Sequence, residues 1–207
     1  MSPQAIAFIF NLPGSAMAVR AVFLVGFMGS GKSSLGKELA RGLGWDFVDL
    51  DTRIETREGQ NIPDIFRDRG EHGFRLAETN ALRALTESFV GNTVVALGGG
   101  AFAQAENRDL LRSWPSVFLE APLDELWNRC LEQAKDRPLR NDRIEFARLY
   151  QYRLPFYRQA TVTVVTSGRD PASLCDEIER KLQSWGRAVD AGLSQMPSTN
   201  SRTGEAQ

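Results

Sequence analysis

The segment Gly26–Ser33 (GFMGSGKS) places the strongest constraint on the fold, because it matches the pattern G-x-x-x-x-G-K-S. Ala21–Val25, directly before it, is a short apolar run typical of a buried strand, and Leu35, Leu39 and Leu43 follow at helical spacing. A strand, a glycine loop and a helix in this order form a phosphate-binding loop. The sequence therefore predicts an α/β protein with a nucleotide site at the end of a strand.

Each position of this loop has a chemical role. Glycines let the backbone turn its N–H groups into one concavity, and the helix that follows adds the positive end of its dipole. Lys32 is expected against the β- and γ-phosphates, and the Ser33 hydroxyl is expected to ligate Mg²⁺. The alternative is a chance match in an ordinary glycine turn, and the flanking strand and helix argue against it.

Length and composition limit the class of protein. A chain of 207 residues suits one domain with a sizeable core. Its 25 basic and 26 acidic residues nearly cancel, which does not favour nucleic-acid binding. Cys130 and Cys175 lie far apart in the sequence, and with the single His72 they predict neither a disulfide framework nor a metal cluster. We expect a cytoplasmic protein, and a monomer as the default state.

The two ends are expected to lie outside the domain, which we place at residues 19–186. No apolar run is long enough to span a membrane. Residues 1–18 contain an apolar stretch and a small-residue triplet that resemble a weak signal peptide, but no basic residue precedes them. We favour a flexible N-terminal extension, with Met17 as a possible natural start, over an export signal. Residues 187–207 are polar and rich in small residues, and are predicted to be a disordered tail.

Two carboxylates are predicted at the end of a second strand. Trp45–Asp51 reads as that strand, and alternation along it would place Asp49 and Asp51 on the same side. The carboxyl ends of strands in an open parallel sheet are where such folds bind ligands. The alternative is that one of the acids caps the next helix.

The third predicted strand, Thr93–Leu97, runs into Gly98–Gly100. Three glycines there would let a ligand approach bare backbone, and a tight turn is the other interpretation. Before this strand, residues 61–85 have a helical pattern that Gly70 and Gly73 interrupt, and Arg75 follows.

The second half of the chain repeats the alternation of strands and helices. Ser116–Glu120 and Thr161–Val165 read as strands, and helical patterns lie after Pro122, over residues 144–158 and between Pro171 and Trp185. Residues 133–143 are short, polar and arginine-rich, which suits a mobile cationic lid over a phosphoryl-transfer site. The whole pattern predicts a three-layer α/β/α sandwich with a five-stranded parallel sheet.

Several segments, taken together, resemble the shikimate kinase family over about residues 20–185. These segments are GFMGSGKSSLGKELA at 26–40, DLDTRIE at 49–55, IPDIFRDRGEHGFRLAE at 62–78, LGGGA at 97–101, RPL at 137–139 and RLPFYRQAT at 153–161. The resemblance implies a P-loop kinase fold similar to the nucleoside monophosphate kinases. It also implies a phosphotransferase with an alcohol acceptor, which converts shikimate and ATP to shikimate 3-phosphate and ADP in aromatic amino-acid biosynthesis.

The resemblance also implies roles for individual residues. Asp51 would orient or deprotonate the acceptor hydroxyl, Arg75 and Arg153 would clamp the shikimate carboxylate, and Gly98, Gly99 and Gly100 would line its pocket. Asp49 would hold Mg²⁺ through water together with Ser33. The ATP site would comprise Gly29, Ser30, Gly31, Lys32, Ser33, Ser34, Arg129, Arg137 and Arg169, with Lys32 and Arg137 also acting in catalysis. The spacing between Arg129 and Arg137 is one residue longer than the family pattern.

Other functions remain as alternatives. Gluconate kinase and the nucleoside monophosphate kinases use the same scaffold, although a nucleobase acceptor needs no pair of carboxylate-binding arginines. A silent nucleotide-binding module is a third possibility, against which stands the presence of every core catalytic position. No N-K-x-D motif occurs, which disfavours a GTPase.

Overall fold

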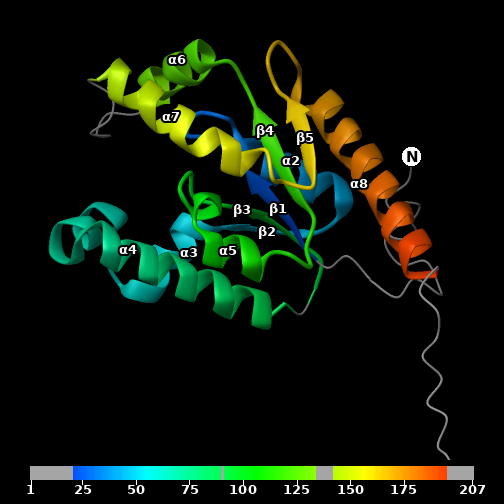
Figure 1. The fold of residues 1–207 in the computed structure, drawn as a ribbon, viewed down its shortest axis with the longest axis horizontal. Coiled ribbons are helices and arrows are strands. Elements are labelled where there is room, and N and C mark those ends of the chain that lie inside the picture. The colour runs from blue at the N-terminus through cyan, green and yellow to red at the C-terminus, as the bar shows by residue number, and fades with distance from the viewer. Residues whose placement is uncertain (1–20, 90, 134–141, 195–207) are drawn as a thin grey trace, which may run out of the picture.

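The computed structural model describes residues 21–89, 91–133 and 142–194, and its centre is one five-stranded sheet (Figure 1). The strands are β1 (Ala21–Val25), β2 (Asp46–Asp49), β3 (Thr93–Ala96), β4 (Ser116–Glu120) and β5 (Val162–Val165). Their order across the sheet is β2-β3-β1-β4-β5, and every pair is parallel. The predicted five-stranded parallel sheet is therefore confirmed.

Helices cover both faces of this sheet. In Figure 1, α4 and α8 lie on opposite sides of it, and α6 and α7 lie beyond the ends toward which the strands point. The helical elements are α2 (Lys32–Leu43), α3 (Leu50–Glu58), α4 (Ile62–Glu87), the 3₁₀ turn η1 (Ala101–Ala103), α5 (Ala105–Leu110), α6 (Leu123–Gln133), α7 (Arg143–Tyr157) and α8 (Pro171–Ser194). This is the predicted α/β/α sandwich.

The central strand β1 connects two hydrophobic cores because it is buried on both faces. Ala21, Phe23 and Val25 point to the core under α3, α4 and α7, whereas Val22 and Leu24 point to the core under α2 and α8. Continuous burial of this kind is what parallel sheets require, since helices cover both of their faces. The sheet therefore provides a rigid base for the loops at its carboxyl edge.

The boundaries of some elements differ from the sequence prediction. Strand β2 ends at Asp49, and Leu50 already begins α3, so Asp51 lies in a helix and not in the strand. In α4, the backbone breaks at Gly70 (φ 66°, ψ −176°), as predicted, but Gly73 stays helical. The short η1 and α5 were not predicted, because segments of this length show no clear helical period.

The last helix is longer than expected. The sequence places the start of a polar tail after Gly186, yet α8 continues to Ser194. Residues 1–18 and most of the predicted lid, 133–143, lie outside the described residues. Within the described ranges, no helix combines the length and the apolar character needed to cross a membrane.

Candidate active site

The phosphate-binding loop joins β1 to α2, as predicted. Gly29 and Gly31 adopt φ angles of 78° and 88°, which L side chains rarely tolerate. Lys32 begins α2, and its ammonium group donates hydrogen bonds of 2.9 Å to the carbonyls of Gly26 and Phe27. The lysine charge is therefore folded back over the loop. Among the other predicted loop residues, Ser30 is buried and Ser34 lies exposed on α2.

Ser33 and Asp49 form a direct contact between α2 and the end of β2. The Ser33 hydroxyl donates a 2.6 Å hydrogen bond to Oδ2 of Asp49, and Oδ1 of Asp49 accepts one of 3.1 Å from the Asp51 amide. Asp49 is thus the N-cap of α3. The sequence interpretation that put both acids on one side of a strand was wrong, because the strand stops at Asp49 and the cap turns the chain into α3.

These oxygen ligands suit Mg²⁺. The ion takes hard oxygen ligands, retains several waters, and is usually held by one or two carboxylates together with substrate phosphates. A hydroxyl and a carboxylate beside a phosphate loop match that donor set. Within residues 21–89, 91–133 and 142–194, no group of three or more His, Cys, Asp or Glu side chains could form a metal cage of protein ligands alone.

Three of the predicted site side chains face the glycines that follow β3. A Cβ atom built on Gly98 would lie 2.5 Å from Oδ1 of Asp51, and one on Gly100 would lie 2.4 Å from Nη1 of Arg75. A Cβ on Gly99 would lie 3.6 Å from Nη1 of Arg153. Only residues without a side chain leave room for the carboxylate and for Arg75. The structure therefore brings these sequence-predicted residues together, and it favours a close-approach surface over a mere turn.

Arg75 is held by two carboxylates on its own helix. It donates to Oε2 of Glu78 at 2.8 Å and to Oε1 of Glu71 at 3.3 Å, and its guanidinium lies 5.1 Å from the centre of the Phe74 ring. Burial lowers the pKa of Arg75, but the charges and hydrogen bonds of both glutamates outweigh that effect and raise it. The guanidinium is therefore a fixed positive charge.

Glu78 is a site residue that sequence reasoning missed. It is 0 % exposed; Oε2 also accepts a 2.7 Å hydrogen bond from Gln104, while Oε1 has no hydrogen-bond partner among the described residues. Burial raises the pKa of the Glu78 carboxyl, Arg75 opposes the rise, and the Asp51 charge adds to it. An acid on the otherwise apolar face of α4 is the sequence signal that points to it.

Arg153 approaches the same glycines from α7. Its guanidinium lies 5.8 Å from the centre of the Phe27 ring, next to the phosphate loop. Arg153 is therefore placed between the loop after β1 and the loop after β3. The site so formed brings the carboxylates of Asp51 and Glu78 near the guanidinium groups of Arg75 and Arg153.

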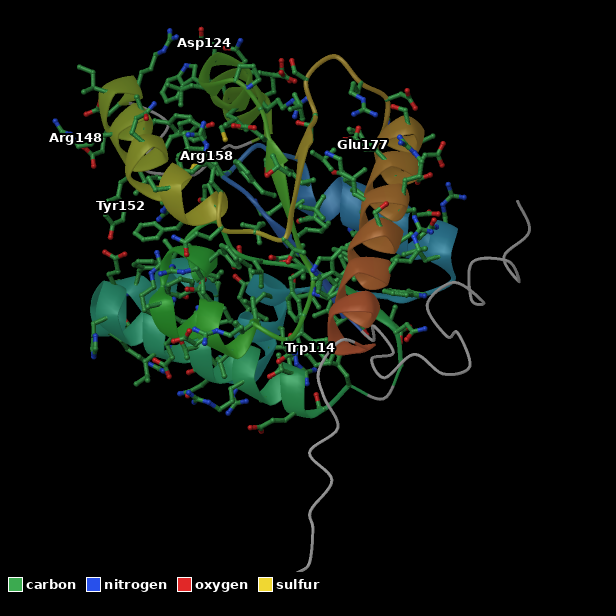
Figure 2. All side chains as sticks on the ribbon, turned by 45° about the vertical axis from the view of Figure 1, so that its right-hand side comes forward. Trp114, Asp124, Arg148, Tyr152, Arg158 and Glu177 are labelled. Atoms are coloured by element: carbon green, nitrogen blue, oxygen red, sulfur yellow. The ribbon has the colours of Figure 1, made fainter. Side chains whose placement is uncertain are left out.

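The structure describes two of the three arginines predicted for the nucleotide, Arg129 and Arg169. Arg129, on α6, donates a 3.4 Å hydrogen bond to the carbonyl of Gly29 and pairs with Glu125. Arg169 precedes α8, where it pairs with Glu177 and donates to the Ser173 carbonyl at 3.1 Å; Figure 2 shows Glu177 on α8 beside the loop that leads into that helix. Arg137 lies outside the described residues.

Comparison with known proteins identifies the family to which this site belongs. Residues 28–183 match the family model described as shikimate kinase. The chain belongs to the shikimate kinase family. The resemblance inferred from the sequence is thereby confirmed, as is the P-loop kinase fold. Membership makes this protein a kinase, that is, a phosphotransferase with an alcohol acceptor, that takes ATP as co-substrate and belongs to aromatic biosynthesis.

The matches to individual relatives extend over almost the full length of each relative. The chain is 40 % identical to a shikimate kinase of Persephonella marina, over 77 % of this chain and 97 % of the relative. It is 42 % identical to a shikimate kinase of Thermus thermophilus, over 83 % and 93 %. The solved shikimate kinase of Acinetobacter baumannii, in complex with shikimate, matches with a TM-score of 0.75 at 34 % identity, covering 88 % of this chain and 98 % of that one.

Proposed function

We propose that this kinase transfers the γ-phosphoryl group of ATP to the 3-hydroxyl of shikimate, giving shikimate 3-phosphate and ADP. The observation that carries the proposal is the approach of Asp51, Arg75 and Arg153 to one backbone segment, Gly98–Gly100, beside the phosphate loop. An acceptor with a carboxylate and a hydroxyl needs this combination of two guanidinium groups and one carboxylate.

Arg75 and Arg153 would bind the acceptor carboxylate. Guanidinium groups suit this task because their planar N–H donors match the two oxygens of a carboxylate. Glu71 and Glu78 support the assignment, since they already fix the Arg75 guanidinium before an acceptor arrives. A preformed clamp reduces the entropy lost on binding.

Asp51 would orient the hydroxyl that attacks the γ-phosphorus. Phosphoryl transfer depends mostly on positioning and on charge stabilisation. Asp51 lies in the first turn of α3, and the Asp49 cap fixes the start of that helix. As the hydroxyl oxygen bonds to phosphorus, its proton would pass to the Asp51 carboxylate, and the bond from the γ-phosphorus to the β-bridging oxygen would break to release ADP.

The donor side would consist of the loop amides, Lys32 and the metal site. Gly29, Ser30, Gly31, Ser33 and Ser34 would surround the phosphates, and Lys32 would neutralise the developing charge. Ser33 and, through water, Asp49 would hold Mg²⁺, which when bound supplies positive charge against the phosphate oxygens. Arg137 remains a predicted lid residue, and Arg129 and Arg169 remain predicted contacts on the nucleotide side.

We also propose an oligomeric state, a location and a limit on partners: the protein is a cytoplasmic monomer that binds no nucleic acid. The near balance of charges and the absence of a disulfide between Cys130 and Cys175 support this view. Light scattering of the purified protein at several concentrations tests the monomer, because a mass that rises with concentration would contradict it.

The experiment that tests the activity measures ADP release from Mg·ATP with shikimate, gluconate or AMP as acceptor. We expect ADP release with shikimate but not with gluconate or AMP, and we expect Lys32→Ala to abolish it. Lys37→Ala is the matched control, because Lys37 lies on the same helix with its ammonium group over the Phe47 ring. ATP binding without turnover of shikimate would contradict the assignment of shikimate as the acceptor, but not the assignment of the nucleotide site.

A further inference from the structure

The Tyr157 side chain at the end of α7 connects two parts of the acceptor site. It is 0 % exposed, and its ring packs 5.4 Å from the ring of Phe118 on β4. Its hydroxyl donates a hydrogen bond to the carbonyl of Gly99, the central glycine of the loop after β3. A buried phenol requires a polar partner of this kind. A contact between α7 and the glycine loop therefore rests on one hydroxyl group.

The charge of Arg153, one helical turn earlier on α7, acts on the same hydroxyl. Burial raises the pKa of the Tyr157 phenol, and the charge of Arg153 and a side-chain hydrogen bond with it act in the opposite direction. A guanidinium can only donate, and a hydroxyl has one hydrogen to give. The Tyr157 hydroxyl therefore gives its one hydrogen to the Gly99 carbonyl, and only its oxygen is left to accept from Arg153.

The hydrogen bond from Tyr157 to Gly99 lies where the two substrates would meet. A Cβ atom built on Gly99 would lie 3.6 Å from Nη1 of Arg153 and 3.6 Å from the amide nitrogen of Met28 in the phosphate loop. Gly99 therefore lies between the acceptor-binding arginine and the loop that receives phosphate. A shift of its peptide would alter the distance between acceptor and donor.

We propose that Tyr157 is a positioning residue, whose hydroxyl fixes the Arg153 guanidinium and the Gly99 peptide relative to each other. The proposal rests on the proposed function, because it assigns Arg153 to the acceptor. It predicts that removal of the hydroxyl weakens acceptor binding and leaves ATP binding intact. If the hydroxyl only stabilised the core, its removal would lower the stability of the protein and leave the affinities for shikimate and ATP unchanged.

The chain offers a matched control on the same helix. Tyr150 is also buried, and its hydroxyl donates to a backbone carbonyl, that of Ala121, at 3.4 Å. Its carbonyl partner follows β4 and is not part of the glycine loop. Tyr152, the remaining tyrosine of α7, is 64 % exposed and lies at the outer side of the helix in Figure 2. Each of the three can be changed to Phe with the ring retained.

The experiment compares steady-state kinetics and calorimetric shikimate binding of Tyr157→Phe, Tyr150→Phe and Tyr152→Phe with those of the wild type. We expect Tyr157→Phe to raise KM and Kd for shikimate about tenfold, the effect of an unpaired buried polar group. KM for ATP should stay within about twofold in all variants, and both controls should keep wild-type shikimate affinity. Urea unfolding of each variant reports its stability separately.

A double-mutant cycle tests whether Tyr157 acts through Arg153. In an Arg153→Ala background, Tyr157→Phe should change shikimate affinity by much less than in the wild type, because the group to be positioned is gone. Additive losses would overturn the proposal. So would equal losses in Tyr157→Phe and Tyr150→Phe, or failure of Tyr157→Phe alone to fold.

The wild-type assay separates this inference from the proposed function. Without shikimate turnover by the wild type, the proposed function itself fails. With wild-type turnover and an unaltered Tyr157→Phe, only the positioning role fails.

Discussion

The Ser33 hydroxyl and the Asp49 carboxylate lie 2.6 Å apart, which ties the first turn of α2 to the end of β2. The carboxylate has a second partner in the Asp51 amide. One side chain therefore fixes the edge of the proposed metal site and the start of the helix that carries the predicted base. The two roles of Asp49 can be separated by mutation.

Asp49→Asn should keep the cap of α3, because the amide oxygen can accept the same hydrogen bond, but it removes the charge next to Ser33. We expect near wild-type stability with a several-fold higher Mg²⁺ requirement. Asp49→Ala should show the same requirement and lose about 1 kcal/mol of stability. Mg²⁺ titration of activity and urea unfolding check both; equal Mg²⁺ dependence in wild type and Asp49→Asn would contradict the metal role.

Asp51→Asn should reduce kcat about 100-fold or more, because an amide cannot take the proton of the acceptor hydroxyl. ATP affinity should be unchanged, since the phosphate loop is untouched. Asp46→Asn is the control, an exposed acid at the start of β2. Single-turnover assays and ATP binding by calorimetry distinguish the outcomes, and full turnover by Asp51→Asn would rule out its assigned role.

Gly98→Ala should reduce kcat about tenfold or more, because its Cβ would lie 2.5 Å from Oδ1 of Asp51 and must displace that carboxylate. Gly42→Ala in α2 is the matched control, since a Cβ there meets nothing within 4 Å. The control should keep wild-type kinetics and gain roughly 0.5–1 kcal/mol of stability. Kinetics and thermal unfolding of the pair test this; a fully active Gly98→Ala would show that Asp51 needs no bare backbone.

Arg153→Gln should raise KM for shikimate about 100-fold with little change in KM for ATP, because it removes a charged partner of the carboxylate. Arg148→Gln provides the comparison: Arg148 lies on the same helix, pairs with Glu145 at 3.0 Å and is labelled at the outer side of α7 in Figure 2. Steady-state kinetics with each substrate varied in turn measure both. An equal rise in both variants would point to a general effect of charge.

Glu78 should make stability depend on pH. Its folded pKa is raised above the ordinary value of 4.5, so the folded state binds the proton more tightly than the unfolded state. This contribution is fully present below pH 4.5 and is lost as pH rises through the folded pKa. Wild type should therefore gain stability relative to Glu78→Gln on acidification toward pH 4.5.

Urea unfolding of Glu78→Gln from pH 8 to pH 5 measures this effect. Glu71→Gln is its control, because Glu71 also contacts Arg75 but its side chain is 70 % exposed. A constant difference between wild type and Glu78→Gln across this range would show that the Glu78 pKa is not raised.

Much of the fold followed from the sequence because local patterns and tertiary structure agree. Ala21–Val25 and Ser116–Glu120 were predicted to the residue, since buried parallel strands read as continuous apolar runs. The end of β2 was misplaced because the last acid of an alternating pattern can equally cap a helix. Alternation alone does not separate these two outcomes.

The site followed from sequence where a motif or a resemblance named the residue. Asp51, Arg75 and Arg153 all approach Gly98–Gly100, and the loop lysine lies at the start of α2. Tyr157 was missed because its importance lies in a contact with Gly99, which is distant in sequence. Glu78 was missed although an acid on the apolar face of α4 marks it, because its burial against Arg75 and Gln104 appears only in the folded structure. No local pattern marks a side chain whose partner is a backbone carbonyl in the loop after β3.

The pairing of β1 with β3 has a consequence for the positions of the donor and acceptor loops. Leu24 is paired with Ala96, and the Leu97 amide donates to the Leu24 carbonyl at 3.0 Å, so the loops that follow these two strands leave adjacent positions in one sheet. Interstrand spacing is nearly invariant, at about 4.8 Å. The sheet thus fixes the spacing between the donor loop after β1 and the acceptor loop after β3, whereas α4 and α7 carry the arginines proposed to bind the acceptor. The spacing of the substrates and the charge that would select the acceptor therefore come from different elements of this fold.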